Sequence, residues 1–145
     1  MLGPLAASHV VILGTDISLP AIAGAEAGIY GPSHLEQLPP DILERYFIPA
    51  GMGQYQVIPS IRRMCIFRRL NLKVAPYPFR KGFHAVFCRN VLYYFERAHQ
   101  VQILEQLYDA TEPGGWLLTS VTEVVRDLRT RWKPVTSGVY QRPPS

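Results

Sequence analysis

The sequence predicts an α/β fold with a mainly parallel sheet, on three observations. The first is an apolar, β-branched run at residues 10–14, which is typical of a strand buried on both faces. The second is the regular alternation of strand-like and helix-like stretches along the chain. The third is composition, because 145 residues with 48% hydrophobic residues and a formal net charge of +4 fit one globular domain. Such a composition excludes a disordered or disulfide-stapled chain.

A helix is predicted directly after the first strand. Ser18 is a favourable N-cap residue, and Pro20 falls in the first turn, where its missing N–H costs nothing. Gly28 favours an end to this helix. Strand and helix together form the opening of a parallel α/β unit.

The next stretch is less regular. Ser33 and Glu36 have the spacing of a capping box, which predicts a short helix after them, and two prolines precede a further helix at residues 42–47. Residues 48–64 are rich in Pro and Gly, with a short alternating piece at 54–58. We expect a small hairpin or loop excursion there.

The remainder of the chain predicts further strands, one long helix and a closing hairpin. The long helix is expected at residues 96–111, with an apolar stripe that includes Ile103 and Leu107, and Pro113-Gly114-Gly115 is expected to end it. Strands are expected at residues 65–70, 83–88 and 116–121, with two more in 127–142 that turn near Ser137-Gly138.

Polar residues stand at the ends of four predicted strands. In open α/β sheets ligands bind beyond the carboxyl ends of the strands, so these residues predict one ligand-binding rim. They are Asp16, Asn71, Arg89 with Asn90, and Thr122 with Glu123.

Two of these residues have an alternative structural interpretation. Asp16 suits the hydroxyls of a ribose, but a carboxylate is also favourable near a helix N-terminus. Asn71 is either a turn residue or an amide that reads an adenine edge. Arg89 and Asn90 follow an apolar strand, where packing gives little reason for them, and this favours a function.

Basic residues cluster at Arg62, Arg63, Arg68, Arg69 and Lys73. They form either the solvated edge of a strand or a patch for an anionic partner. Base-stacking aromatic residues do not interleave with them, so we expect no nucleic-acid binding.

The two cysteines, Cys65 and Cys88, lack the spacing of a metal site, and the four histidines are scattered. We therefore expect no metal, reduced thiols and a cytoplasmic protein. No apolar run approaches the roughly 18 residues of a membrane helix, and the N-terminus lacks the pattern of a signal peptide. Membrane insertion is therefore not expected.

The motifs taken together resemble the C-terminal part of a CheR-type chemotaxis receptor methyltransferase, a protein-glutamate O-methyltransferase. The resemblance extends over residues 10–142, and its most specific segment is Phe-Cys-Arg-Asn-Val-Leu-Tyr-Tyr-Phe at residues 87–95. Other matching segments are Thr-Asp-Ile-Ser at 15–18, Ala-Gly-Ile-Tyr at 27–30, Leu-Pro-Pro at 38–40, Arg-Tyr-Phe at 45–47, Asn-Leu at 71–72 and Glu-Pro-Gly-Gly at 112–115.

The resemblance implies a Rossmann-like methyltransferase sheet that binds S-adenosylmethionine. By this resemblance Asp16 holds the ribose hydroxyls, and Asn71 and Leu72 line the adenine side. Cys88 and Arg89 border the cofactor from the next strand end.

The same resemblance implies methyl transfer to glutamate side chains of chemotaxis receptors. Asn90 helps to fix the site loop, and Tyr94 is the catalytic residue that faces the transferred methyl. A glutamate nucleophile is already ionised at neutral pH, so Tyr94 is expected to orient groups rather than to take a proton. Residues 48–66 correspond to a small β-subdomain, which in some members docks a receptor tail peptide.

Some parts of the family pattern have no counterpart in the sequence. Residues 1–145 are therefore expected to form a partial domain, truncated at the N-terminus, without the first strand and the Gly-rich loop of the cofactor site. His84 replaces the usual Asp of the fourth strand. The alternative function is a non-catalytic relative that acts as a protein-binding module in signalling.

Overall fold

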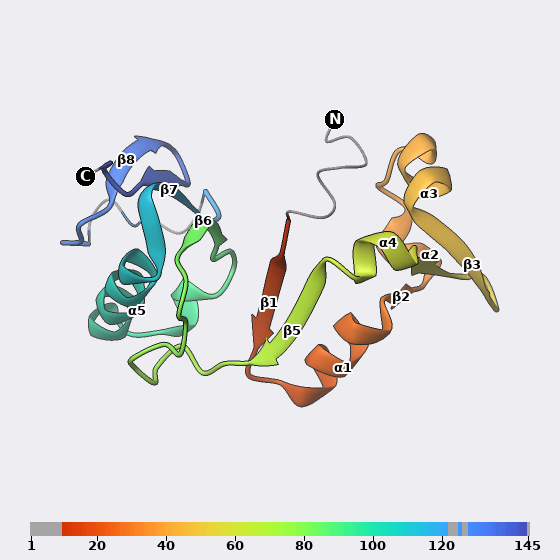
Figure 1. Cartoon of the computed structure of the whole chain (residues 1–145), viewed down its shortest axis with the longest axis horizontal. Helices are drawn as coiled ribbons and strands as arrows, with labels where there is room; N and C mark the ends of the chain where they lie inside the picture. The colour runs from red at the N-terminus through yellow and green to blue at the C-terminus, as the bar shows by residue number, and fades with distance from the viewer. Residues whose placement is uncertain (1–9, 122–124, 126–127, 145) are drawn as a thin grey trace. The chain divides into compact units, whose positions relative to one another are not determined.

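The computed structural model describes residues 10–121, 125 and 128–144. It divides the chain into two compact units, Met1–Asn71 and Leu72–Ser145, each of which is described by itself (Figure 1). The predicted polar pair Thr122 and Glu123 lies outside the described residues.

The first unit contains a parallel pair of strands. β1 (Ile12–Asp16) pairs with β5 (Cys65–Arg69), and the register runs from Ile12 opposite Cys65 to Asp16 opposite Arg69. A Cβ atom at Gly14 would lie 2.6 Å from the ring of Phe67, so a glycine is needed for the ring to lie against β1. The predicted strands at residues 10–14 and 65–70 are thereby confirmed, with the first shifted toward Asp16.

α1 (Leu19–Ala27) follows β1 and packs on both strands. The hydroxyl of Ser18 accepts a 3.3 Å hydrogen bond from the amide of Ala21, which satisfies one of the free donors at the helix start. Gly28 ends the helix with a left-handed φ of 62°, which a residue without a Cβ adopts freely. Both predicted boundaries of this helix are confirmed.

A small antiparallel sheet lies in the same unit. Its strands are β2 (Ile29–Tyr30), β4 (Gln54–Val57) and β3 (Phe47–Gly51), in the order β2-β4-β3. The β3–β4 hairpin falls in the segment predicted to be an excursion. Three short helices accompany it: α2 (Pro32–Leu35), α3 (Pro40–Tyr46) and α4 (Pro59–Arg62).

The predicted capping box at Ser33 and Glu36 is wrong. Ser33 lies inside α2, whose N-cap is Gly31, and no side chain caps this helix. Pro32 at the first helical position starts the helix two residues earlier than a Ser33 cap would, because its φ is already helical.

The second unit is built on a four-stranded mixed sheet in the order β6-β7-β9-β8. β6 (Phe83–Phe87) is parallel to β7 (Thr111–Leu118), and α5 (Arg97–Asp109) connects them and lies alongside β7 in Figure 1. β8 (Lys133–Thr136) and β9 (Val139–Gln141) form the predicted closing hairpin. A 3₁₀ turn, η2 (Leu92–Tyr94), precedes α5.

Two expectations about this architecture are wrong. Among the described residues, two strand pairs, β1–β5 and β6–β7, are parallel, and the other four are antiparallel, so the sheets are mixed rather than mainly parallel. Pro113, Gly114 and Gly115 lie inside β7, and α5 already ends at Asp109. The amide of Gly114 and the carbonyl of Gly115 both bond to the backbone of Arg142, which draws this segment into the sheet.

The buried apolar core lies almost entirely in the second unit. Ile103, Leu104 and Leu117 have no exposed area, and the indole N–H of Trp132 donates a 2.9 Å hydrogen bond to the carbonyl of Leu104. In the first unit Leu35 is the one buried apolar side chain among the described residues. The complete described core comprises Leu35, Tyr77, Cys88, Leu92, Ile103, Leu104, Leu107, Leu117, Val125, Leu128, Trp132 and Tyr140.

Candidate functional site

The first unit brings Asp16 and Asn71 to the same end of the β1–β5 pair. Asp16 is the last residue of β1, and Asn71 stands two residues after β5. The amide of Leu70 donates a 2.9 Å hydrogen bond to the carbonyl of Asp16, which extends the parallel ladder past the end of β5. Asp16 and Asn71 are both exposed at this carboxyl end, as the sequence predicts for a ligand-binding rim.

The carboxylate of Asp16 has the structural role that the sequence left open, and this role does not exclude the ligand-binding one. Its Oδ1 accepts a 2.8 Å hydrogen bond from the amide of Ser18, at the start of α1. Its Oδ2 has no hydrogen-bond partner in the described part of the chain. One oxygen therefore supports the helix N-terminus, and the other is free to accept hydrogen bonds from a ligand.

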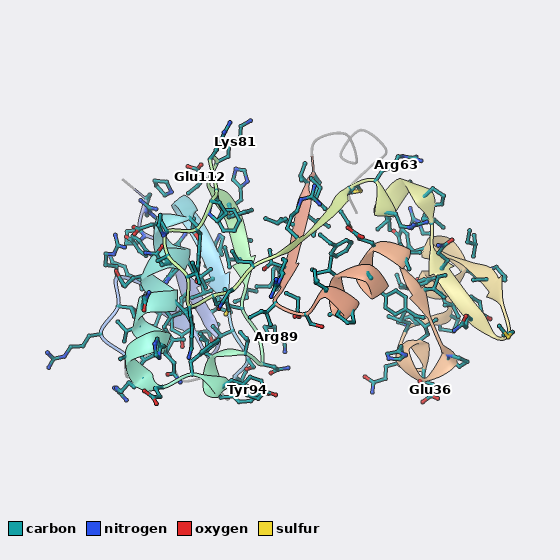
Figure 2. The ribbon with its side chains drawn as sticks, turned by 90° about the horizontal axis from the view of Figure 1, so that it is seen from below. Glu36, Arg63, Lys81, Arg89, Tyr94 and Glu112 are labelled. Atoms are coloured by element: carbon teal, nitrogen blue, oxygen red, sulfur yellow. The ribbon has the colours of Figure 1, made fainter. Side chains whose placement is uncertain are left out.

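In the second unit, Cys88, Arg89 and Asn90 leave the carboxyl end of β6. Cys88 is only 6% exposed, and its amide donates a 2.9 Å hydrogen bond to the carbonyl of Leu118, one step beyond the ladder to β7. Asn90 has a left-handed φ of 58°, a conformation that asparagine tolerates better than most residues. The turn leaves the guanidinium of Arg89 exposed, as Figure 2 shows.

Tyr94 ends the 3₁₀ turn that follows, and its side chain is 75% exposed. Its ring centroid lies 4.3 Å from that of Tyr93, so the two exposed phenols form one aromatic surface. Leu92, which is 3% exposed, anchors the turn in the core. Tyr94 is thus presented outward from a buried anchor (Figure 2).

Gln100 is a positioning residue that the sequence reasoning missed. Its side-chain amide, on α5, donates hydrogen bonds of 3.0 Å to the carbonyl of Leu92 and 2.8 Å to that of Phe95. These bonds fix both ends of the turn that carries Tyr94. The signal in the sequence was a glutamine beside the apolar stripe of a helix, where packing alone would favour an apolar residue.

Leu72 is held by a buried phenol. The hydroxyl of Tyr77 donates a 2.9 Å hydrogen bond to the carbonyl of Leu72. Burial, together with the nearby Cys88 thiol, raises the pKa of Tyr77 to about 12. The phenol therefore remains a donor across the physiological pH range, and it couples the Leu72 backbone to the neighbourhood of Cys88.

The predicted site residues are thus divided between the units. Asp16 and Asn71 belong to the first unit, and Leu72, Cys88, Arg89, Asn90 and Tyr94 belong to the second. The described residues contain no group of three or more His, Cys, Asp or Glu side chains that could hold a metal ion. They also contain no helix long and apolar enough to cross a membrane.

Comparison with known proteins decides the family. A family model described as "CheR methyltransferase, SAM binding domain" matches residues 2–140. The chain belongs to this family. S-adenosylmethionine (SAM) is the cofactor that the family description names.

Chemotaxis protein methyltransferases are among the relatives of this CheR-family chain. It is 37% identical to chemotaxis protein methyltransferase 1 of Pseudomonas aeruginosa over 144 residues, which cover 97% of the chain and 52% of that protein. It is 34% identical to one from Pseudomonas putida, covering 90% of the chain and 48% of the relative. The chain is also 33% identical to a chemotaxis protein methyltransferase from Klebsiella aerogenes, and the match covers 86% of the chain and 45% of that relative. The chain thus spans about half the length of these relatives.

A solved structure shares the fold at low sequence identity. It is described as a possible exported protein from Bordetella parapertussis, with 14% identity and a TM-score of 0.50. The match covers 94% of this chain and 54% of that one. This likeness concerns the fold alone.

Proposed function

We propose that the chain forms the adenosine-holding half of a SAM-dependent methyltransferase that methylates glutamate side chains of chemotaxis receptors in the cytoplasm. The observation that carries the proposal is the carboxylate of Asp16, exposed at the carboxyl end of β1 with one oxygen free. Two vicinal ribose hydroxyls need such an acceptor at this position in a nucleotide-binding sheet. Cys65 and Cys88 form no disulfide, which fits a reducing compartment.

The residues of both units fit the cofactor by their chemistry. The free oxygen of Asp16 accepts from the ribose, and Asn71 and Leu72 border the adenine. Cys88 and Arg89 stand at the end of β6, where a buried thiol lies next to an exposed cation. Asn90 makes the tight turn that aims Arg89 outward, through its left-handed backbone.

The bound cofactor supplies an electrophilic methyl group on a sulfonium. In the proposed reaction a carboxylate oxygen of the substrate glutamate attacks this methyl, so that a C–O bond forms as the C–S bond breaks. The carboxylate is ionised at neutral pH, so no general base is needed. Tyr94 contributes by orienting the carboxylate with its phenol, and Gln100 holds the turn that positions Tyr94.

The open edges of the two parallel pairs support the assignment of the chain to one half of a larger sheet. β1 pairs on one edge with β5, and β6 pairs on one edge with β7; among the described residues no strand pairs with the other edge of either. The family resemblance includes a first strand that has no counterpart in the matched segments. We infer that the half of the relatives not matched by the chain supplies this strand and the loop for the methionine end of the cofactor.

Calorimetry with S-adenosylhomocysteine tests the cofactor part of the proposal. The chain is titrated to millimolar ligand, and Asp16→Asn serves as the matched variant because its side-chain oxygen still accepts from the Ser18 amide. Binding that Asp16→Asn weakens supports the proposal. Absence of heat at millimolar ligand would overturn it for this chain and favour a non-catalytic, protein-binding role.

A chimera tests the reaction. Residues 1–145 replace the matching half of the Pseudomonas aeruginosa relative, and transfer of labelled methyl from SAM to receptor-containing membranes is measured. Base-labile label in the receptor is expected, because glutamate methyl esters hydrolyse in base. Unlabelled receptor, with the chimera folded and binding cofactor, would contradict the proposed substrate.

A further inference from the structure

The second unit begins with an irregular segment, residues 72–82, that has one buried side chain. That side chain is Tyr77, which is 9% exposed, and its neighbours Pro76 and Pro78 are exposed. A tyrosine ring is large enough to anchor such a segment, but a buried hydroxyl also needs a hydrogen-bond partner. The partner lies at the start of the same segment.

The hydroxyl of Tyr77 donates a 2.9 Å hydrogen bond to the carbonyl of Leu72, five residues earlier. Leu72 is half-buried and lies in a turn, outside the strands of either unit. Pairing within a sheet therefore does not fix the direction of its carbonyl. The phenol of Tyr77 fixes it instead, and the bond closes residues 72–77 into a short loop.

Aromatic contacts hold the ring of Tyr77 independently of its hydroxyl. Tyr77 meets Phe79 edge to face, with ring centroids 5.9 Å apart, and Phe79 meets Phe83 in the same way at 4.9 Å. Phe83 is the first residue of β6. Loss of the hydroxyl alone should therefore leave the ring in place, since these contacts involve only the aromatic surfaces.

The same side chain lies close to Cys88, just beyond the other end of β6. Burial raises the pKa of Tyr77 to about 12, and charge on the sulfur of Cys88 contributes to this rise. Such an interaction weakens with distance, so the two side chains are neighbours. Tyr77 thus contacts Leu72 and lies beside Cys88, and the family resemblance assigns both of these residues to the cofactor site.

The hydroxyl of Tyr77 does more than a loop anchor requires. A phenylalanine at this position would bury the same apolar surface and would have no polar group to satisfy. Burying a hydroxyl costs free energy that its hydrogen bond offsets with only a modest net gain in stability. What the hydroxyl adds is direction, because it fixes the backbone of the residue that borders the adenine.

We propose that Tyr77 is a positioning residue of the cofactor site, which holds Leu72 at the adenine edge and fixes its place relative to Cys88. The proposal rests on the proposed function, because Leu72 borders an adenine only if the chain binds SAM. Tyr77 acts through Leu72 and not by touching the base. A Leu72 backbone held in one orientation fits one base edge, and a released backbone adapts to a different base more readily. Tyr77 therefore contributes to selectivity for adenine.

Calorimetry with the full chain measures this selectivity. The ligands are S-adenosylhomocysteine and S-inosylhomocysteine, in which a carbonyl and a ring N–H replace the amino group and the ring acceptor of adenine. The native chain should prefer S-adenosylhomocysteine. Tyr77→Phe should weaken binding of S-adenosylhomocysteine about fivefold, as for one hydrogen bond, and leave binding of the inosine analogue nearly unchanged.

Arg131→Ala is the matched control. It removes ion pairs with Glu105 and Asp109 at the surface of the same unit, so it lowers stability without touching the cofactor site. Lower stability alone weakens the binding of both ligands by the same factor and leaves the preference between them unchanged. Circular dichroism should show that both variants remain folded.

The outcomes separate this proposal from the proposed function. If the native chain binds S-adenosylhomocysteine and Tyr77→Phe binds it equally well, or weakens both ligands equally, Tyr77 does not position the adenine edge and the proposed function stands. The same loss of preference in Arg131→Ala would also overturn the role of Tyr77. Absence of binding by the native chain would overturn the proposed function and this proposal with it.

Discussion

The amide of Leu70 lies 2.9 Å from the carbonyl oxygen of Asp16, and this hydrogen bond holds the ends of two parallel strands level. Asp16 follows an apolar strand and Asn71 follows Leu70, so the bond sets both polar residues at one end of the sheet. The carboxylate of Asp16 therefore has a fixed backbone position and one free oxygen.

Replacing Asp16 separates its two roles. Asp16→Asn should weaken S-adenosylhomocysteine binding about tenfold or more, because a neutral amide is a poorer acceptor for two hydroxyls, while the stability of the chain stays nearly unchanged. Asp16→Ala should also cost about 1 kcal/mol of stability, because the Ser18 amide loses its acceptor. Calorimetry and urea unfolding measure the two effects. Asp41→Asn, on α3, is the control, and an equal loss of binding in that variant would contradict the role of Asp16.

Stability should fall in alkali because of Tyr77. Burial, with Cys88, raises its pKa from 10.0 to about 12, so the unfolded chain loses this proton at lower pH than the folded chain. Stability is therefore complete below pH 10 and declines as pH rises toward 12, by up to about 2 kcal/mol. Urea unfolding across this range measures it.

Tyr77→Phe provides the comparison for the alkaline transition. The variant should be about 1 kcal/mol less stable at neutral pH, because the carbonyl of Leu72 loses its donor. Its stability should depend less steeply on pH than that of the native chain. Parallel pH profiles for the two proteins would show that Tyr77 is not the cause.

Arg131 ties the segment before β8 to α5. It forms ion pairs with Glu105 and with Asp109, and its guanidinium carbon lies 4.1 Å from the ring centroid of Tyr108. Arg131→Ala should lower the free energy of unfolding by about 1 kcal/mol, a modest amount because the side chain is half exposed. Chemical unfolding in low and high salt measures it, with exposed Arg129→Ala as the control. An equal loss of unfolding free energy in the two variants would contradict a specific role for the Arg131 contacts.

Amide exchange should differ between the two units. Amides of α5 and β7 should be the most protected, since they surround Ile103, Leu104 and Leu117. Amides of β1 and α1 should exchange faster in the isolated chain, because Ile12 is 47% and Leu19 is 61% exposed. Mass spectrometry of deuterated peptides measures the difference. Equal protection of β1 and β7 would contradict the unequal burial.

Tyr94 should affect the rate of methyl transfer and leave cofactor binding intact. In the chimera, Tyr94→Phe should lower kcat about tenfold, because one hydrogen bond to a charged group is lost, with little change in KM for SAM. Tyr93→Phe is the matched control on the adjacent ring. An unchanged rate in Tyr94→Phe would remove Tyr94 from the proposed mechanism.

Local signals predicted the elements well where one residue decides the backbone. Ser18 and Gly28 marked the ends of α1 because capping and left-handed geometry depend on single residues. The capping box predicted at Ser33 was wrong because a single neighbouring residue, Pro32, favours an earlier start of the helix. The prediction that Pro113 to Gly115 end the long helix was wrong. The pairing of this segment with Arg142, far along the chain, decides its conformation. The sequence predicted the residue types of the candidate site. It did not predict that Gln100 supports the turn that carries Tyr94.

The sequence by itself determined the family, the order of the elements and the positions of the polar residues after the strands, because short motifs and periodicity encode these locally. Tertiary structure alone decided which strands pair. Among the described residues, it gave β1 and β6 one partner each, concentrated the buried core in the second unit and left one oxygen of Asp16 without a partner. Strand pairing and side-chain contacts depend on residues distant in sequence, which local pattern does not specify.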